Sequence, residues 1–88
     1  MSAVAWAYPP EILVAIASLG VVPTPETPPR LVREYLSGLY KFEIRRLRDR
    51  HRAGEVSKPD YIPHVIELRK KYWMLTLEPR TWEEICRS

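Results

Sequence analysis

The sequence predicts an all-α fold, a small antiparallel helical hairpin with a short helix before it and a helical turn after it. Three observations support this class. Apolar residues recur at helical spacing in three segments of the 88-residue chain. Prolines stand where these segments begin, and glycines stand where two of them end. The two longer segments are joined by a short loop, which is typical of an αα-hairpin.

The first helix is expected over about residues 10–19. Pro9 and Pro10 suit a first helical turn, because the N–H that proline lacks is unpaired there in any case. Gly20 follows the apolar positions and suits a helix stop. A strand through Ile12–Ile16 is the alternative, since a short apolar run does not distinguish the two by periodicity. The apolar positions of this segment are Ile12, Leu13, Ile16 and Leu19.

A longer helix is expected over about residues 28–52, after a proline-rich linker at 21–27 that cannot be helical. Thr27 is its predicted N-cap, and Gly54 lies just beyond its end. Its apolar residues cover so wide an arc that more than one neighbour is needed to bury them. They are Leu31, Val32, Tyr35, Leu36, Leu39, Tyr40, Phe42, Ile44 and Leu47.

A third helix is expected over about residues 59–75, with Pro63 tolerated in its first turn. A last helical turn is expected at residues 82–87, because Thr81 and Glu84 have the spacing of a capping box. The predicted buried face of the third helix is formed by Ile62, Val65, Ile66, Leu68, Tyr72, Trp73 and Leu75.

The charge divides the chain into two parts within a single predicted domain. Residues 1–29 form an apolar, proline-rich arm with a net charge of −2, and residues 30–88 form a basic helical-hairpin body with a net charge of +5. Such asymmetry favours an anionic partner for the body or a protein partner for the arm. The longest apolar run is too short to span a bilayer, and the single cysteine fits a reducing compartment, so we expect a cytoplasmic protein without a membrane span.

Residue types that carry catalysis or bind metals are sparse. His51 and His64 are too far apart in the sequence to form a ligand pair on one helix, and Cys86 has no second cysteine. The chain has three glycines and no glycine-rich phosphate loop. We therefore expect no enzyme activity, no metal, no cofactor and no small-molecule substrate.

A basic stripe is the most function-like feature of the long helix. Lys41, Arg45, Arg48 and Arg52 fall on one helical edge and have the spacing of a row that can follow a phosphate backbone. The alternative is an ordinary solvated face. Glu43, Arg46 and Arg69 fall inside apolar arcs, and we expect their charged ends to reach water. The alternative is an ion pair between Glu43 and Arg69 across the two helices, or a contact to a partner chain.

The arm contains large apolar side chains that have no core of their own. Trp6, Tyr8, Ile12 and Ile16 either fold back over the hairpin or anchor in another protein as partner-binding residues. The predicted function is a non-enzymatic protein–protein interaction module, a small structural or adaptor subunit with a protein partner or a homo-oligomeric assembly. The alternative is a small nucleic-acid-binding protein that uses the basic stripe.

Overall fold

The computed structural model describes residues 5–87 and has the predicted all-α class. Within this range no strand is present, and a single isolated antiparallel bridge joins Trp6 to Arg87. The elements in chain order are α1 (Pro10–Ala17), α2 (Pro29–Arg52), α3 (Lys58–Lys71), the 3-10 turn η1 (Trp73–Thr76) and α4 (Pro79–Ile85).

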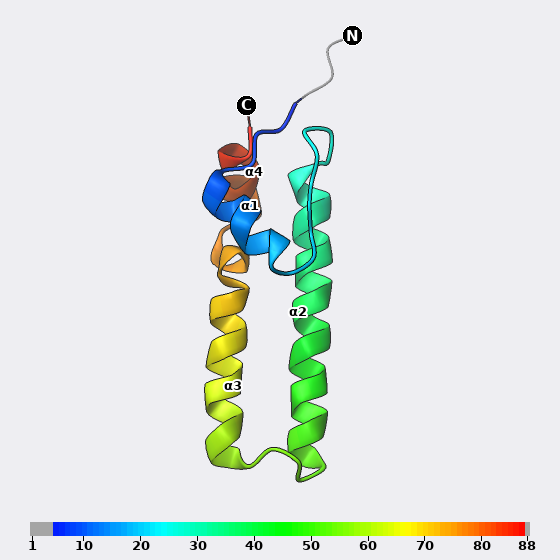
Figure 1. Ribbon diagram of the computed structural model, residues 1–88, viewed down its shortest axis with the longest axis vertical. Coiled ribbons are helices and arrows are strands. Elements are labelled where there is room, and N and C mark those ends of the chain that lie inside the picture. The colour runs from blue at the N-terminus through cyan, green and yellow to red at the C-terminus, as the bar shows by residue number, and fades with distance from the viewer. Residues whose placement is uncertain (1–4, 88) are drawn as a thin grey trace.

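The molecule is elongated because the hairpin is much longer than the other helices. Its extents are 56 × 20 × 18 Å and its radius of gyration is 15.6 Å, whereas a compact chain of this length would have about 12 Å. Helices α2 and α3 lie side by side and antiparallel, while α1, η1 and α4 gather at one end (Figure 1). We call this end the head (residues 5–40 and 72–87) and the projecting part of the hairpin the stalk (residues 41–71).

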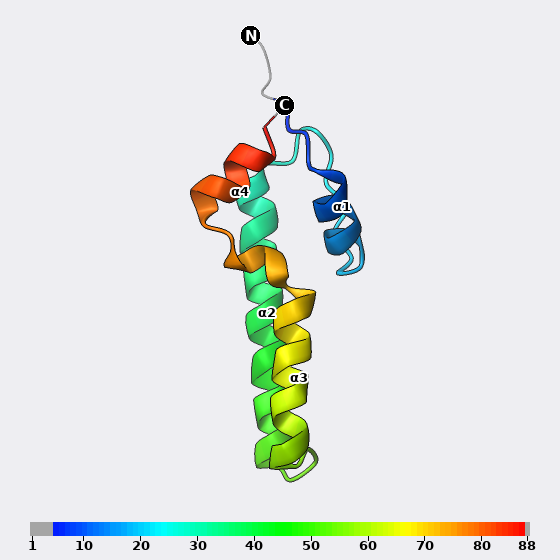
Figure 2. The same cartoon turned by 90° about the vertical axis from the view of Figure 1, so that its left-hand side faces the viewer.

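The hydrophobic core lies in the head. In Figure 2, α1 lies on one side of α2 and α4 on the other, while η1 crosses in front of α2. The indole Nε1 of Trp82 donates a hydrogen bond of 2.7 Å to the carbonyl O of Pro29, which holds α4 against the first turn of α2. The buried core side chains are Tyr8, Ile12, Ile16, Leu19, Val32, Leu36, Tyr72, Met74, Trp82 and Cys86.

The stalk has almost no core of its own. Leu47 and Val56 are its buried hydrophobic residues, and α3 contributes no buried residue. The turn at its tip is held by a 2.7 Å hydrogen bond from Nδ1 of His51 to the carbonyl O of Val56. The His51 ring also stacks on Tyr61, with ring centroids 4.6 Å apart. The stalk is therefore a single layer of two helices that is closed at its tip.

The two glycines predicted as helix stops have that role. Gly20 and Gly54 have φ angles of 84° and 80°, the left-handed region in which a Cβ is strained. The N–H of Val21 donates to the carbonyl O of Ile16, and the N–H of Glu55 donates to that of Arg50. Both are the six-to-one bonds of a Schellman motif, which satisfy carbonyls left free at a helix end.

The two predicted threonine caps are wrong. Helix α2 begins at Pro29 after Pro28, and no side chain caps it. The hydroxyl of Thr27 instead accepts a hydrogen bond from the backbone N–H of Thr24. Helix α4 begins at Pro79, so Thr81 already lies inside the helix and caps nothing. In both cases proline supplies the first helical φ angle, and the helix starts without a capping hydroxyl.

The third helix ends earlier than predicted. It stops at Lys71, and Tyr72 leaves helical geometry with φ −107° and ψ 33° before η1 begins. At this position Tyr72 is buried in the head core, and its ring packs edge-on against Tyr40 with centroids 5.3 Å apart. Burial of this ring and of the following Met74 sets the end of the helix, although the apolar spacing alone continues to Leu75.

Candidate interaction surfaces

The residues of the arm lie in the core of the chain itself. Tyr8, Ile12 and Ile16 are buried, and Trp6 is partly buried against the same core. The Tyr8 hydroxyl donates a hydrogen bond of 2.6 Å to the carbonyl O of Thr27. The arm therefore adopts the folded-back alternative, because its apolar groups complete the core that the hairpin cannot close alone. A partner could reach these four side chains only if the arm left the head.

The predicted basic stripe is brought together on one edge of α2. Lys41, Arg45, Arg48 and Arg52 are all exposed, and they follow one another over about 16 Å of helix. Within residues 5–87 none of them forms an ion pair or a side-chain hydrogen bond. The stripe is thus an uncompensated cationic edge.

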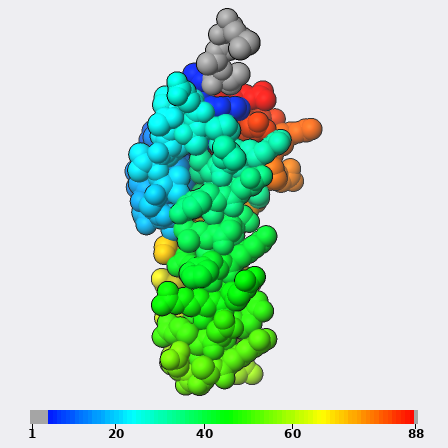
Figure 3. All heavy atoms as spheres, turned by 90° about the vertical axis from the view of Figure 1, so that its right-hand side faces the viewer, coloured from blue at the N-terminus to red at the C-terminus, as the bar shows by residue number. Residues whose placement is uncertain are grey.

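A groove runs along the stalk on the face that α1 covers in the head. Figure 3 shows α1 and the loop after it standing out from the upper part of the molecule, while the lower part is narrower. The groove has a volume of about 820 Å³, and Ser18 and Leu19 close its upper end. We call it the stalk groove. Its apolar lining consists of Leu39, Phe42, Leu47 and Leu68, together with Leu19 and the ring of Tyr72.

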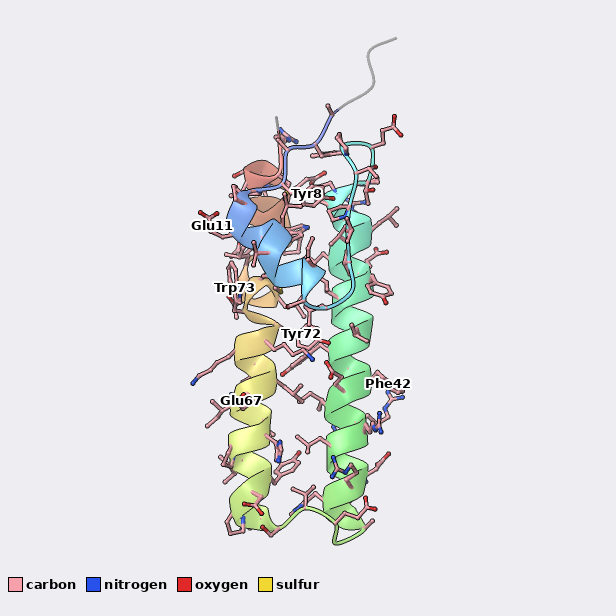
Figure 4. All side chains as sticks on the ribbon, viewed as in Figure 1. Tyr8, Glu11, Phe42, Glu67, Tyr72 and Trp73 are labelled. Atoms are coloured by element: carbon pink, nitrogen blue, oxygen red, sulfur yellow. The ribbon has the colours of Figure 1, made fainter. Side chains whose placement is uncertain are left out.

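Tyr72 and Glu43 link the two helices where the stalk meets the head. The Tyr72 side chain extends from the end of α3 toward α2 just below α1 (Figure 4), and its hydroxyl donates a hydrogen bond to the Glu43 carboxylate. Nζ of Lys71 lies 3.5 Å from Oε1 of the same carboxylate. Arg69 is exposed, which agrees with the expectation that its charged end reaches water, and the alternative ion pair with Glu43 does not form because Lys71 contacts that carboxylate instead.

The rest of the groove rim is cationic. Arg46 and Lys70 line it and have no ion-pair partner in the described part of the chain. Arg50 lies 3.7 Å from the carboxylate of Glu55, and both side chains are more than half exposed, so this pair is weak. Across the whole stalk the side chains give a net charge of +5, while those of the head give −2. The positive charge of the protein is therefore concentrated in the stalk.

Apolar side chains are also exposed on the stalk outside the groove. Ile62 and Ile66, one turn apart on α3, are 55% and 46% exposed and do not line the groove. Trp73, the first residue of η1, is 40% exposed. Helical spacing predicted a buried face for all three. That prediction is wrong, because in the described part of the chain α2 is the main neighbour of α3 and leaves these side chains uncovered.

The stalk groove was not predicted from the sequence. Its apolar lining residues were recognised as apolar positions of the helices. Which of them are covered depends on where α1 ends, and its end is set by the turn at Gly20. The wide apolar arc of the long helix was the available indication that a further layer is needed.

The buried titratable groups of the head are not poised for chemistry. Burial raises the pKa of the Cys86 thiol to about 11. Burial, followed by the nearby Cys86, raises the pKa of Tyr8 to about 12. Both groups are therefore neutral near pH 7, and a neutral thiol is a poor nucleophile.

Neither a metal site nor a membrane-spanning helix is found among residues 5–87. No group of three or more His, Cys, Asp or Glu side chains is placed to hold a metal ion. None of the helices in this range is both long and apolar enough to cross a membrane. Comparison with protein-family models, with curated proteins and with solved structures finds no match to this chain.

Proposed function

We propose that this chain is a non-enzymatic interaction module, a small structural or adaptor subunit, which docks onto another protein through its stalk. The observation that carries the proposal is the single-layer construction of the stalk. Phe42, Ile62 and Ile66 are 59%, 55% and 46% exposed there. Two packed helices cover only the sides that they turn toward each other, so burying the remaining apolar sides needs another layer. A partner protein would supply that layer.

The division of the molecule supports the same proposal. The head contains the buried aromatic and aliphatic residues, so it accounts for folding without the stalk surface. The stalk extends away from the head (Figure 1), and its apolar groups are surrounded by exposed charges. Apolar groups within a charged rim are the usual composition of a protein-binding surface.

Affinity capture from an extract of the native cells tests this function with two matched variants. Phe42→Asp places a charge on the stalk, and Tyr35→Asp places the same charge on an aromatic position of the same helix in the head. The exposed fractions of the two side chains are 59% and 58%, so both variants should fold. We expect a stoichiometric protein to be captured by the wild type and by Tyr35→Asp, and to be lost with Phe42→Asp.

The same experiment, repeated with nuclease, tests nucleic-acid binding. The unpaired stripe favours this second function, since exposed arginines that form no ion pair can neutralise phosphates. Under this alternative, capture would be nuclease-sensitive and would be lost on replacing Arg45, Arg48 and Arg52 with Gln. Nuclease-resistant capture that depends on Phe42 and not on these arginines supports the protein-interaction module. If Phe42→Asp captures the partner protein as well as the wild type does, the result contradicts the protein-interaction module.

A further inference from the structure

Helix α1 shows what kind of segment fits the groove face. Its residues Ile12, Ile16 and Leu19, at positions i, i+4 and i+7, are buried in the head core that also holds Val32 and Leu36 of α2. Gly20 then turns the chain back, so the layer that α1 begins stops at the upper end of the stalk groove. Beyond this point the twelve stalk residues of α2 (41–52) extend for about 18 Å with α3 beside them and no third described helix over the groove.

The stalk groove continues the same kind of apolar surface. Leu47 is buried at its floor, Leu39 and Leu68 are partly buried, and Phe42 lies at its rim. A groove between two helices that is open along its length suits an amphipathic helix with apolar side chains one turn apart. A helix of about 12 residues matches about 18 Å of groove.

The charges on the rim select the chemistry of that helix. Glu43 is already bound by Tyr72 and Lys71. Among the described lining residues this leaves Arg46, Arg50 and Lys70 against the carboxylate of Glu67. An incoming helix therefore meets a predominantly positive rim, and Asp or Glu beside its apolar stripe would complement that rim.

A second copy of this chain is a poorer occupant. The stalk has a net charge of +5, so pairing two stalks face to face would bring like charges together around the buried surface. Such repulsion opposes association and falls with added salt. A nucleic acid would meet the phosphate-binding groups of the stripe, but it would leave the apolar floor of the groove unused.

We infer that the stalk groove binds an amphipathic helix of a partner protein, next to the end of α1, with acidic residues on both sides of the apolar stripe of that helix. This inference rests on the proposed function and adds the conformation and charge of the partner segment. It assigns Arg46, Arg50 and Lys70 as the groups that select an acidic partner over a basic one.

Fluorescence anisotropy with two designed peptides tests the inference on the full chain. Each peptide is a capped helix of about 14 residues with leucines at i, i+4, i+7 and i+11. Glutamates flank the leucines in the acidic peptide, and lysines replace them in the basic one. We expect the acidic peptide to bind at least about tenfold more tightly, with an affinity that falls as salt is raised.

Two charge-reversal variants on the same helix provide a matched comparison. Arg46→Glu with Arg50→Glu alters the rim of the groove, whereas Arg48→Glu with Arg52→Glu makes the same change of net charge on the basic stripe. We expect the rim variant to lose at least about tenfold in affinity for the acidic peptide and the stripe variant to lose less than about threefold. Amide chemical shifts should change at Leu39, Phe42 and Leu68 rather than at Ile62 and Ile66.

Several results would overturn the inference. Equal loss in the two variants would show attraction to overall charge rather than to the groove. Shift changes centred on Ile62 and Ile66 would place the site on the other side of α3. No binding of the acidic peptide at about 1 mM, or a dimer in light scattering that blocks it, would also exclude the inference. If Phe42-dependent capture persisted after such a result, the proposed function would stand without the acidic helix.

Discussion

Tyr72 shows how one side chain determines the boundary between head and stalk. It ends α3, enters the core beside Tyr40, and donates a hydrogen bond to Glu43 across the hairpin. Burial, then the hydrogen bond to Glu43 and the charge of that carboxylate, raise the pKa of the Tyr72 hydroxyl. The hydroxyl thus remains a donor over the whole neutral and mildly alkaline range.

Removing this hydroxyl should destabilise the protein measurably. We expect Tyr72→Phe to lower the free energy of unfolding by about 1–3 kcal/mol, because a partly buried hydrogen bond to a charged acceptor is lost. Tyr40→Phe is the matched control, since the structure shows no hydrogen bond from the Tyr40 hydroxyl, and it should change stability by less than about 0.5 kcal/mol. Urea melts of the two variants measure the difference. If both variants lost the same free energy of unfolding, the hydrogen bond to Glu43 would make no net contribution to stability.

At the scale of the element, α2 is the helix that the sequence defines best, and its glycines have opposite roles. Gly38 lies in the helix interior, while Gly54 follows its end with a φ of 80°. An added Cβ would meet nothing within 4 Å at either position. Any difference between alanine substitutions at these two positions therefore comes from the backbone and not from packing.

The two substitutions should change stability in opposite directions. Gly38→Ala should raise the free energy of unfolding by about 0.5–1 kcal/mol, because alanine restricts the unfolded chain and favours the helix. Gly54→Ala should lower it by about 1–2 kcal/mol, because a Cβ is strained at positive φ. Thermal melts followed by circular dichroism give both values. A stabilising Gly54→Ala would show that the Schellman turn is not needed to close the stalk.

The sequence predicted an element correctly where local residues set its ends, and less well where contacts in the folded head set them. Local chemistry predicts α2, since Pro29 and Gly54 mark its two ends. The end of α3 could not be predicted in this way, because Tyr72 and Trp73 continue its apolar spacing and only burial in the head interrupts the helix. Thr27 and Thr81 were assigned as caps by type, although the prolines that follow or precede them set where the helices begin.

The candidate surfaces also differ in how far they could be predicted from the sequence. The basic stripe depends on spacing within one helix, and Lys41, Arg45, Arg48 and Arg52 are as exposed as the sequence predicts. The stalk groove depends on three helices together, so no single periodicity shows it. For the arm, apolar composition fits a partner contact and an internal contact equally well. Only the structure shows Tyr8 and Ile16 inside the head.

For the whole molecule, the separation of head and stalk is the main property. The head holds the core with a net charge of −2, and the stalk displays a net charge of +5 on a two-helix layer. Under the proposed function, folding and docking belong to different ends of a molecule 56 Å long. This separation predicts that the stalk can be shortened while the head remains folded.

Removing residues 44–50 and 61–67 takes two turns from each helix and keeps their relative phase. It retains Leu68 and the bond from His51 to Val56 at the tip, and it removes the stacking of His51 on Tyr61. We expect the shortened protein to keep its helical spectrum and to melt within about 5–10 °C of the full chain, because the excised segments contain no residue of the head core. Capture of the protein partner should be lost. A shortened chain that does not fold would show that the head depends on the stalk.

The antiparallel bridge between Trp6 and Arg87 also has a mechanical consequence. The backbone N–H of Ala7 donates to the carbonyl O of Cys86 at 2.7 Å, so the chain enters and leaves the head at adjacent points. A tension applied between these points would peel the head open from its ends, one hydrogen bond at a time. The stalk does not lie between these two points, so its helices would carry no tension until the head had opened.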